Sequence, residues 1–185
     1  MAMAISGQKG TEPKRVLEAL LIATDQPVSV ARLVRTIGHG VDSRRVRKLI
    51  QELQEEYEAS GRAFQIEEIA EGFQILTRRE YSDWIVKLRK SRREEHLTPS
   101  AVETLAIVAF RQPVLRVEID DIRGVHCGPL LRGLIEKSLV KIVGRQNVPG
   151  RPILYGTTRR FLQTFGLKSI RDLPKLGALP PMAEA

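Results

Sequence analysis

The chain has 185 residues, of which 42% are hydrophobic and 28% are charged. This composition is typical of a folded globular protein and excludes the disordered and membrane-embedded classes. The net charge of +8 allows attraction to nucleic acid, but residues 1–95 carry 17 Lys/Arg against 15 Asp/Glu, whereas residues 96–185 carry 13 against 7. Neither half has the dense basic stripe of a dedicated nucleic-acid-binding protein.

Two further features of the sequence concern its compartment. No stretch approaches the roughly 20 apolar residues of a membrane-spanning helix, and Met1 to Gly10 lack the apolar middle of a signal peptide. We therefore expect a cytoplasmic protein without membrane contact. The single cysteine, Cys127, excludes an internal disulfide and any multi-cysteine metal site.

An internal repeat appears when the chain is shifted by 86 residues, because Gln26-Pro27-Val28 then falls on Gln112-Pro113-Val114. In each copy an apolar helix runs into Gln-Pro-Val, where the proline forces the preceding residue out of helical geometry. A second short helix follows and ends near Gly38 or Gly124. The repeat predicts a helix-turn-helix at the start of each copy.

The first copy continues with a helix and a hairpin. The helix is predicted after Asp42, with one apolar face made by Val46, Leu49, Ile50, Leu53 and Tyr57. The alternation of apolar residues on either side of Glu71-Gly72 then predicts two strands joined at this dipeptide. Three helices and a hairpin make a winged helix.

The second copy repeats this order. Thr98-Pro99 is typical of a helix start, a further helix is expected near Gly128 to Lys137, and Pro149-Gly150 predicts a type II turn between two strands. The fold class is therefore α+β, with two tandem winged-helix domains at 11–90 and 97–174 and a flexible tail at 175–185. Lys87 to His96 is expected to be a solvated linker or a helix extension, with Trp84, Ile85 and Leu88 packed on the first domain.

Several strings of the second copy closely resemble the segregation and condensation protein B family. They are Glu103-Thr104-Leu105-Ala106-Ile107, Gln112-Pro113, Ile122-Arg123-Gly124-Val125, Gly150-Arg151-Pro152, Tyr155-Gly156-Thr157-Thr158 and Phe165-Gly166-Leu167. The resemblance extends from about Thr98 to Pro174, and the first copy resembles the other winged-helix domain of that family by position and pattern. Phe110 and His126-Cys127 depart from the familiar pattern.

The resemblance implies a non-catalytic subunit of the bacterial condensin-like complex. Such a subunit forms a homodimer, here expected through 11–90, and binds the kleisin subunit ScpA, here expected through 97–174. The kleisin bridges to a structural-maintenance-of-chromosomes (SMC) ATPase, and the complex supports chromosome condensation and segregation. The resemblance implies no cofactor and a location at the nucleoid in the cytoplasm.

Catalytic chemistry has little support in the sequence. His126 and Cys127 are adjacent, so their side chains diverge, whereas a nucleophile and its base must converge. His39 and His96 stand isolated, so we expect no metal site. No glycine pattern matches a phosphate loop or a dinucleotide fingerprint. We therefore predict that the protein is not an enzyme and uses no cofactor.

Binding residues are expected in both copies. The residues predicted to bind the kleisin are Ile122, Arg123, Val125, Arg145, Arg151 and Tyr155, because arginine and tyrosine are usual anchors and this half is basic. The third helix of the first copy begins with Arg44, Arg45, Arg47 and Lys48, which could contact DNA weakly and without sequence preference. A solvated charged face is the plainer interpretation, since the same helix is rich in acid. A tandem winged-helix transcription regulator remains the alternative function.

Overall fold

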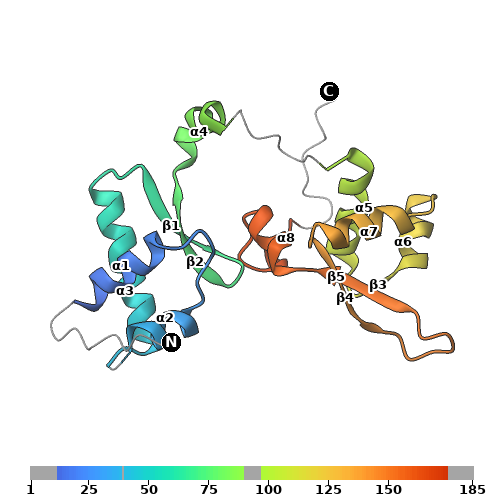
Figure 1. Ribbon diagram of the computed structural model, residues 1–185, viewed down its shortest axis with the longest axis horizontal. Coiled ribbons are helices and arrows are strands. Elements are labelled where there is room, and N and C mark those ends of the chain that lie inside the picture. The colour runs from blue at the N-terminus through green and yellow to red at the C-terminus, as the bar shows by residue number, and fades with distance from the viewer. Residues whose placement is uncertain (1–11, 39, 90–96, 175–185) are drawn as a thin grey trace, which may run out of the picture. The chain divides into compact units, whose positions relative to one another are not determined.

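The chain divides into two compact units, Met1–Arg92 and Arg93–Ala185, each described here by itself. The computed structural model in Figure 1 describes residues 12–38, 40–89 and 97–174. The expected tail at 175–185 and most of the expected linker lie outside these residues. Within the described ranges, no helix combines the length and apolar character needed to cross a membrane.

Unit 1 is a winged helix made of helices followed by a hairpin. Its elements in chain order are α1 (Pro13–Ile22), α2 (Val30–Ile37), α3 (Ser43–Ala59), β1 (Phe64–Ile69), β2 (Gly72–Thr77), a short 3₁₀ helix η1 (Arg79–Tyr81) and α4 (Ser82–Arg89). The strands β1 and β2 pair in antiparallel fashion. Asp42 caps α3 because its side chain accepts a hydrogen bond from the Arg45 backbone N–H at 2.7 Å.

The core of unit 1 is centred on α3, as the apolar periodicity predicts. The predicted face is buried along its whole length, at Val46, Leu49, Ile50, Leu53 and Tyr57. The Tyr57 hydroxyl donates a 2.7 Å hydrogen bond to Glu18 of α1. Burial raises the pKa of Tyr57 above its ordinary value, and the hydrogen bond to Glu18 adds to this rise. The phenol therefore stays protonated and links α3 to α1.

The turn of the first hairpin lies one residue earlier than predicted. Ile69 pairs with Gly72, so the two turn residues are Ala70 and Glu71, both with positive φ. Gly72 belongs to β2, where it lies against another part of the backbone: a Cβ at this position would be 2.9 Å from the Val28 carbonyl carbon. The glycine is thus required by close packing and not by the turn.

Unit 2 repeats the winged-helix plan and adds elements at its end. It contains α5 (Pro99–Arg111), β3 (Val114–Leu115), α6 (Arg116–Arg123), α7 (Gly128–Glu136), β4 (Val140–Arg145), β5 (Ile153–Thr157), α8 (Arg159–Thr164) and a short 3₁₀ helix η2 (Ile170–Asp172). The predicted Thr98 cap, Pro99 start and Pro149-Gly150 turn are confirmed, since Gly150 has φ +85° and the Arg151 N–H donates to the Val148 carbonyl at 2.9 Å.

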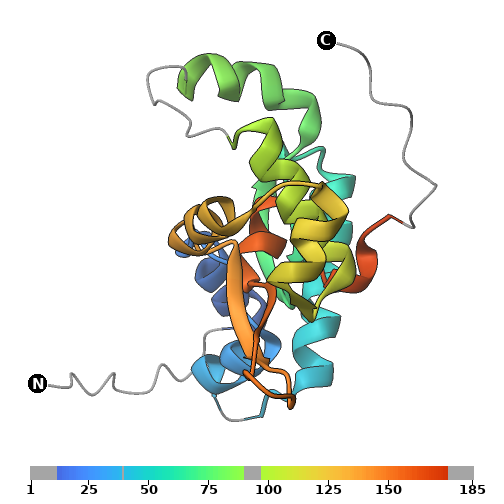
Figure 2. The same cartoon turned by 90° about the vertical axis from the view of Figure 1, so that its right-hand side faces the viewer.

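The sheet of unit 2 has the strand order β3-β5-β4. Gln112, just before β3, fixes this arrangement because its side-chain carbonyl accepts a 2.8 Å hydrogen bond from the Thr157 backbone N–H. The helices cover only part of the sheet. In both views the β4–β5 hairpin, drawn in orange, extends beyond them as a free wing (Figures 1 and 2).

The prediction that Trp84 and Leu88 pack on unit 1 is wrong. The side chains of Trp84 and Leu88 are 66% and 84% exposed, and Val86 between them is 55% exposed. Only Ile85 is half-buried. Trp84, Val86 and Leu88 are exposed because α4, which follows the hairpin and η1, contacts mainly η1 within the described chain and is not packed on the helical core. An apolar surface is therefore left uncovered at the end of unit 1.

We predict that Gly72→Ala lowers the free energy of unfolding by about 1–3 kcal/mol, because the added methyl group forces the Val28 backbone to shift. Gly133→Ala in α7 is the control, since a Cβ there meets nothing within 4 Å. It should raise stability by up to about 1 kcal/mol, because alanine favours helix. Urea denaturation followed by circular dichroism measures both, and an unchanged Gly72→Ala would contradict the close contact.

Candidate partner-binding site

The side chains of His126 and Cys127 diverge, as expected from their adjacency. Cys127 is fully buried and its thiol lies near Thr104, whereas the His126 side chain is 69% exposed and lies 3.0 Å from Asp120. The loop serves the fold, since Asp120 also accepts a 2.7 Å hydrogen bond from the Cys127 backbone N–H. Among the residues that the structure describes, no group of three or more His, Cys, Asp or Glu could hold a metal ion.

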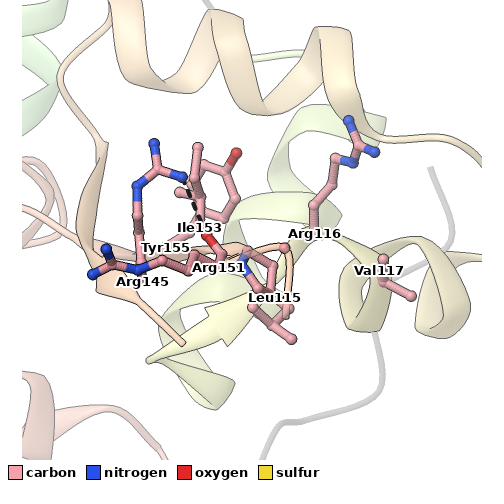
Figure 3. Close-up of a pocket in the computed structure, with 9 residues that line it drawn as sticks. Leu115, Arg116, Val117, Arg145, Arg151, Ile153 and Tyr155 are labelled. Atoms are coloured by element: carbon pink, nitrogen blue, oxygen red, sulfur yellow. Dashed lines mark hydrogen bonds between the residues drawn. The ribbon is translucent and has the colours of Figure 1, made fainter. Parts of the chain in front are cut away.

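A pocket of about 300 Å³ lies where the wing of unit 2 leaves the helices (Figure 3). It is formed between the start of α6 and the outer part of the wing, including the turn. The lining residues are Leu115, Arg116, Val117, Arg145, Gly150, Arg151, Pro152, Ile153 and Tyr155. We call it the wing pocket. It combines an apolar floor with arginine guanidinium groups and contains no acidic residue.

Two of the arginines are held together at one side of the wing pocket. Arg145, on β4, donates a 3.1 Å hydrogen bond through Nη1 to the backbone carbonyl of Arg151. Arg151 follows the turn glycine and has φ +40°, which turns its carbonyl toward Arg145. Arg116 points the other way, along α6, where its Nε lies 3.9 Å from Asp120 (Figure 3). The pocket thus offers Arg145 and Arg151 to a partner.

Tyr155 lies at the inner end of the wing pocket. It is half-buried, packs partly against the core of unit 2 and pairs with Val114 on one side and Ile142 on the other. Ile142 is 55% exposed, so apolar surface continues from the pocket along β4. Tyr155 therefore supports the wing and also faces the pocket (Figure 3).

The other predicted kleisin residues lie away from the wing pocket. Ile122 lines a separate hollow with Arg111, Pro113 and Glu118, and Val125 follows α6 with 54% exposure. The Arg123 side chain is only 12% exposed, because it forms an ion pair with Glu103 and its Nη2 donates a 2.8 Å hydrogen bond to the Ser100 hydroxyl. The structure thus brings together Arg145, Arg151 and Tyr155 but not Ile122, Arg123 or Val125.

Sequence reasoning missed the part of the wing pocket contributed by Leu115 and Val117. Leu115 and Val117 lie some 30 residues before the wing, so no local pattern connects them to it. The signal that was available is the Gln-Pro-Val repeat. The segment that starts with the valine of this motif pairs with the second strand of the hairpin in both units. Val28 forms an isolated bridge to Phe73 of β2, and the corresponding segment of the second copy is strand β3, which pairs with β5.

The four basic residues of α3 are all exposed, but they differ in their neighbours. Arg45 lies 3.8 Å from Glu52, and Arg47 lies 3.8 Å from Glu68 on β1. For Arg44 and Lys48, no ion-pair partner is found within the described ranges. Weak DNA contact by these side chains stays a prediction, and the acidic neighbours of Arg45 and Arg47 reduce what those two can contribute.

Comparison with known proteins places most of this chain in one family. The family described as segregation and condensation complex subunit ScpB matches residues 15–176. The chain is 47% identical over 165 residues to segregation and condensation protein B of Syntrophotalea carbinolica, which covers 89% of this chain and 82% of that protein. It is 42% identical over 161 residues to the protein of the same name from Symbiobacterium thermophilum, with 87% and 72% covered.

A solved structure shows the same similarity in sequence. ScpB from Mycobacterium tuberculosis is 31% identical, with 88% of this chain and 99% of that chain covered and a TM-score of 0.41. The winged-helix fold of each unit follows from its own helices and hairpin and not from this structural similarity.

We predict that Arg123→Ala lowers the free energy of unfolding by about 1–3 kcal/mol, because it leaves the Ser100 groups and Glu103 without their partner. Glu103→Gln is the matched control and should cost less than about 1 kcal/mol, because Glu103 is 65% exposed. Thermal and urea unfolding measure both. If the Arg123→Ala chain is as stable as the parent, these contacts do not stabilise the fold, and Arg123 is available to bind a partner.

Proposed function

This chain belongs to the segregation and condensation complex subunit ScpB family, and we propose that it acts as a subunit of the bacterial condensin-like SMC complex. It works by protein contact, without catalysis, and binds the kleisin subunit ScpA. Its place is at the chromosome in the cytoplasm. The description of the family as a complex subunit supports this proposal, whereas the transcription-regulator alternative has no support from the comparisons.

The observation that carries the kleisin proposal is the wing pocket of unit 2. Hot spots at protein interfaces are enriched in arginine and tyrosine placed around a desolvated centre. Arg145, Arg151 and Tyr155 are arranged in this way beside exposed apolar surface at Ile142 and Val117. We place the kleisin-binding surface here, on unit 2.

We predict that Arg151→Ala and Tyr155→Ala each weaken binding of full-length ScpA from the same genome by about 1–2 kcal/mol. Each change removes a side chain that faces the wing pocket. Isothermal titration calorimetry with the full chain measures the effect. Arg132→Ala, which changes an exposed arginine on α7 outside the pocket, is the control and should bind as the parent does.

Tyr155 needs a second variant because it also packs against the core. Tyr155→Phe keeps the ring and should preserve folding, so it separates the hydroxyl from the packing. Circular dichroism establishes that each variant is folded. If the folded Arg151→Ala and Tyr155→Ala chains bind ScpA as tightly as the parent, the kleisin surface lies elsewhere on the molecule.

We further propose that unit 1 forms a homodimer through the apolar surface of η1 and α4. This surface is made by Tyr81, Trp84 and Leu88, which follow one another at helical spacing and are between 37% and 84% exposed. The Tyr81 and Trp84 rings contact each other with centroids 6.4 Å apart. Burying large apolar side chains against a second copy is the common way for soluble homo-oligomers to remove such a surface from water.

We predict that the full chain is a dimer at micromolar concentration and that Trp84→Glu combined with Leu88→Glu makes it a monomer. Two carboxylates cannot be buried without partners, so the interface should open. Multi-angle light scattering measures the mass. The control is Val143→Glu together with Val148→Glu, which places the same charges on exposed positions of unit 2. A dimer that survives the α4 changes would show that this surface has another role.

A further inference from the structure

The short length of β3 leaves an open place beside β5. Only Val114 and Leu115 pair with β5, opposite Tyr155 and Leu154. At Leu115 the chain turns into α6, and Glu118 secures this turn by accepting a 2.7 Å hydrogen bond from the Leu115 backbone N–H. Strand β5 starts at Ile153, which pairs with Arg145 of β4 on its other side. On the β3 side, no strand of the described chain pairs with Ile153.

The wing pocket occupies this open place. Leu115, Arg116 and Val117 bound it where β3 has ended, and the end of the wing turn (residues 150–152) and the start of β5 at Ile153 bound its other side. Its volume of about 300 Å³ is at the lower end of the range for ligand pockets, which suits one or two side chains. The geometry is that of a missing continuation of β3, so an extended segment fits it better than a helix, whose diameter with side chains is about 10–12 Å.

The charge around the wing pocket selects the kind of segment. Residues 97–174 carry 12 Lys/Arg against 6 Asp/Glu. Four of the six acidic side chains already form bonds within this unit. Glu103 forms an ion pair with Arg123, and backbone N–H groups of Leu115, Cys127 and Ser169 donate hydrogen bonds to Glu118, Asp120 and Asp172, respectively. None of the six lines the pocket, while Arg145 and Arg151 both do.

The hollow that contains Ile122 gives a useful contrast. It is similar in volume, about 380 Å³, but its lining includes both Glu118 and Asp121 beside Arg111. A carboxylate entering there would meet like charge. Of these two hollows, the wing pocket is therefore the one that favours an acidic partner.

We infer that the wing pocket binds an extended segment in which an acidic residue stands next to an aliphatic one. The carboxylate engages Arg145 and Arg151, and the aliphatic side chain packs against Val117 and Ile153. This inference rests on the proposed kleisin function and names the motif through which the kleisin is recognised. Arginine suits this role because its planar guanidinium can bind a carboxylate through two parallel hydrogen bonds.

The test uses overlapping 15-residue peptides that span ScpA of the same genome, added to the isotope-labelled full chain. We expect peptides that shift the amide signals of Leu115, Val117 and Ile153 to contain Asp or Glu beside Leu, Ile or Val. Replacing that acid with its amide should weaken binding roughly tenfold, as expected for a lost charge-assisted hydrogen bond. Transferred nuclear Overhauser effects of the bound peptide should be those of an extended chain.

A charge exchange provides the matched control. Arg151→Glu should abolish binding of the acidic peptide, and a peptide with Lys in place of the acid should regain part of it. Arg132→Glu, on α7, should change neither. A variant that was merely misfolded would not be rescued by a peptide of opposite charge, so the exchange separates recognition from folding.

The outcomes distinguish the inference from the function it rests on. If full-length ScpA binds but no peptide shifts the wing-pocket signals, or if the amide replacement has no effect, the inference is wrong and the kleisin function stands. If the bound peptide is helical, the extended geometry is wrong. If neither ScpA nor any of its peptides binds the chain, the proposed function itself fails.

Discussion

Both units depend on one backbone interaction, the pairing of the segment after the first helix with the second strand of the wing. In unit 1, Val28 and Phe73 exchange two hydrogen bonds of 2.9 Å. In unit 2, Val114 pairs with Tyr155 and the segment extends to Leu115. This pairing joins the helices to the hairpin and, in unit 1, requires Gly72 at the point of closest approach. In unit 2 it stops at Leu115, where the chain turns into α6. The wing pocket is a consequence of that stop.

The sequence predicted the helices and hairpins because their signals are local. The face of α3 from Val46 to Tyr57 and the cap at Thr98 follow from spacing within a single element. The one-residue error in the first turn had a different cause. A glycine between two strands is usually read as a turn residue, whereas Gly72 is needed because the Val28 backbone, 44 residues away, leaves no room for a Cβ.

The candidate site was predictable only in part, and the reason is again distance along the chain. Arg145, Arg151 and Tyr155 belong to one hairpin, so a sequence argument about the wing includes all three. Leu115 and Val117 join them through tertiary structure alone. Arg123 was predicted to bind the kleisin because it lies in a family-like string and arginine is a usual anchor, and neither property reveals that its side chain bonds to Ser100 and Glu103. Trp84 shows the reverse: its apolar character suggested burial, yet it is exposed.

The hydrogen bond between Arg145 and Arg151 ends on a backbone carbonyl and not on a side chain. The position of Arg145 is therefore set by the shape of the turn, which depends on Gly150 and on the left-handed conformation of residue 151. Residue 151 can change its side chain while its carbonyl continues to hold Arg145 in place. An uncharged side chain at residue 151 therefore removes one of the two guanidinium groups while the turn still holds the other, so the pocket keeps a cation in the same position.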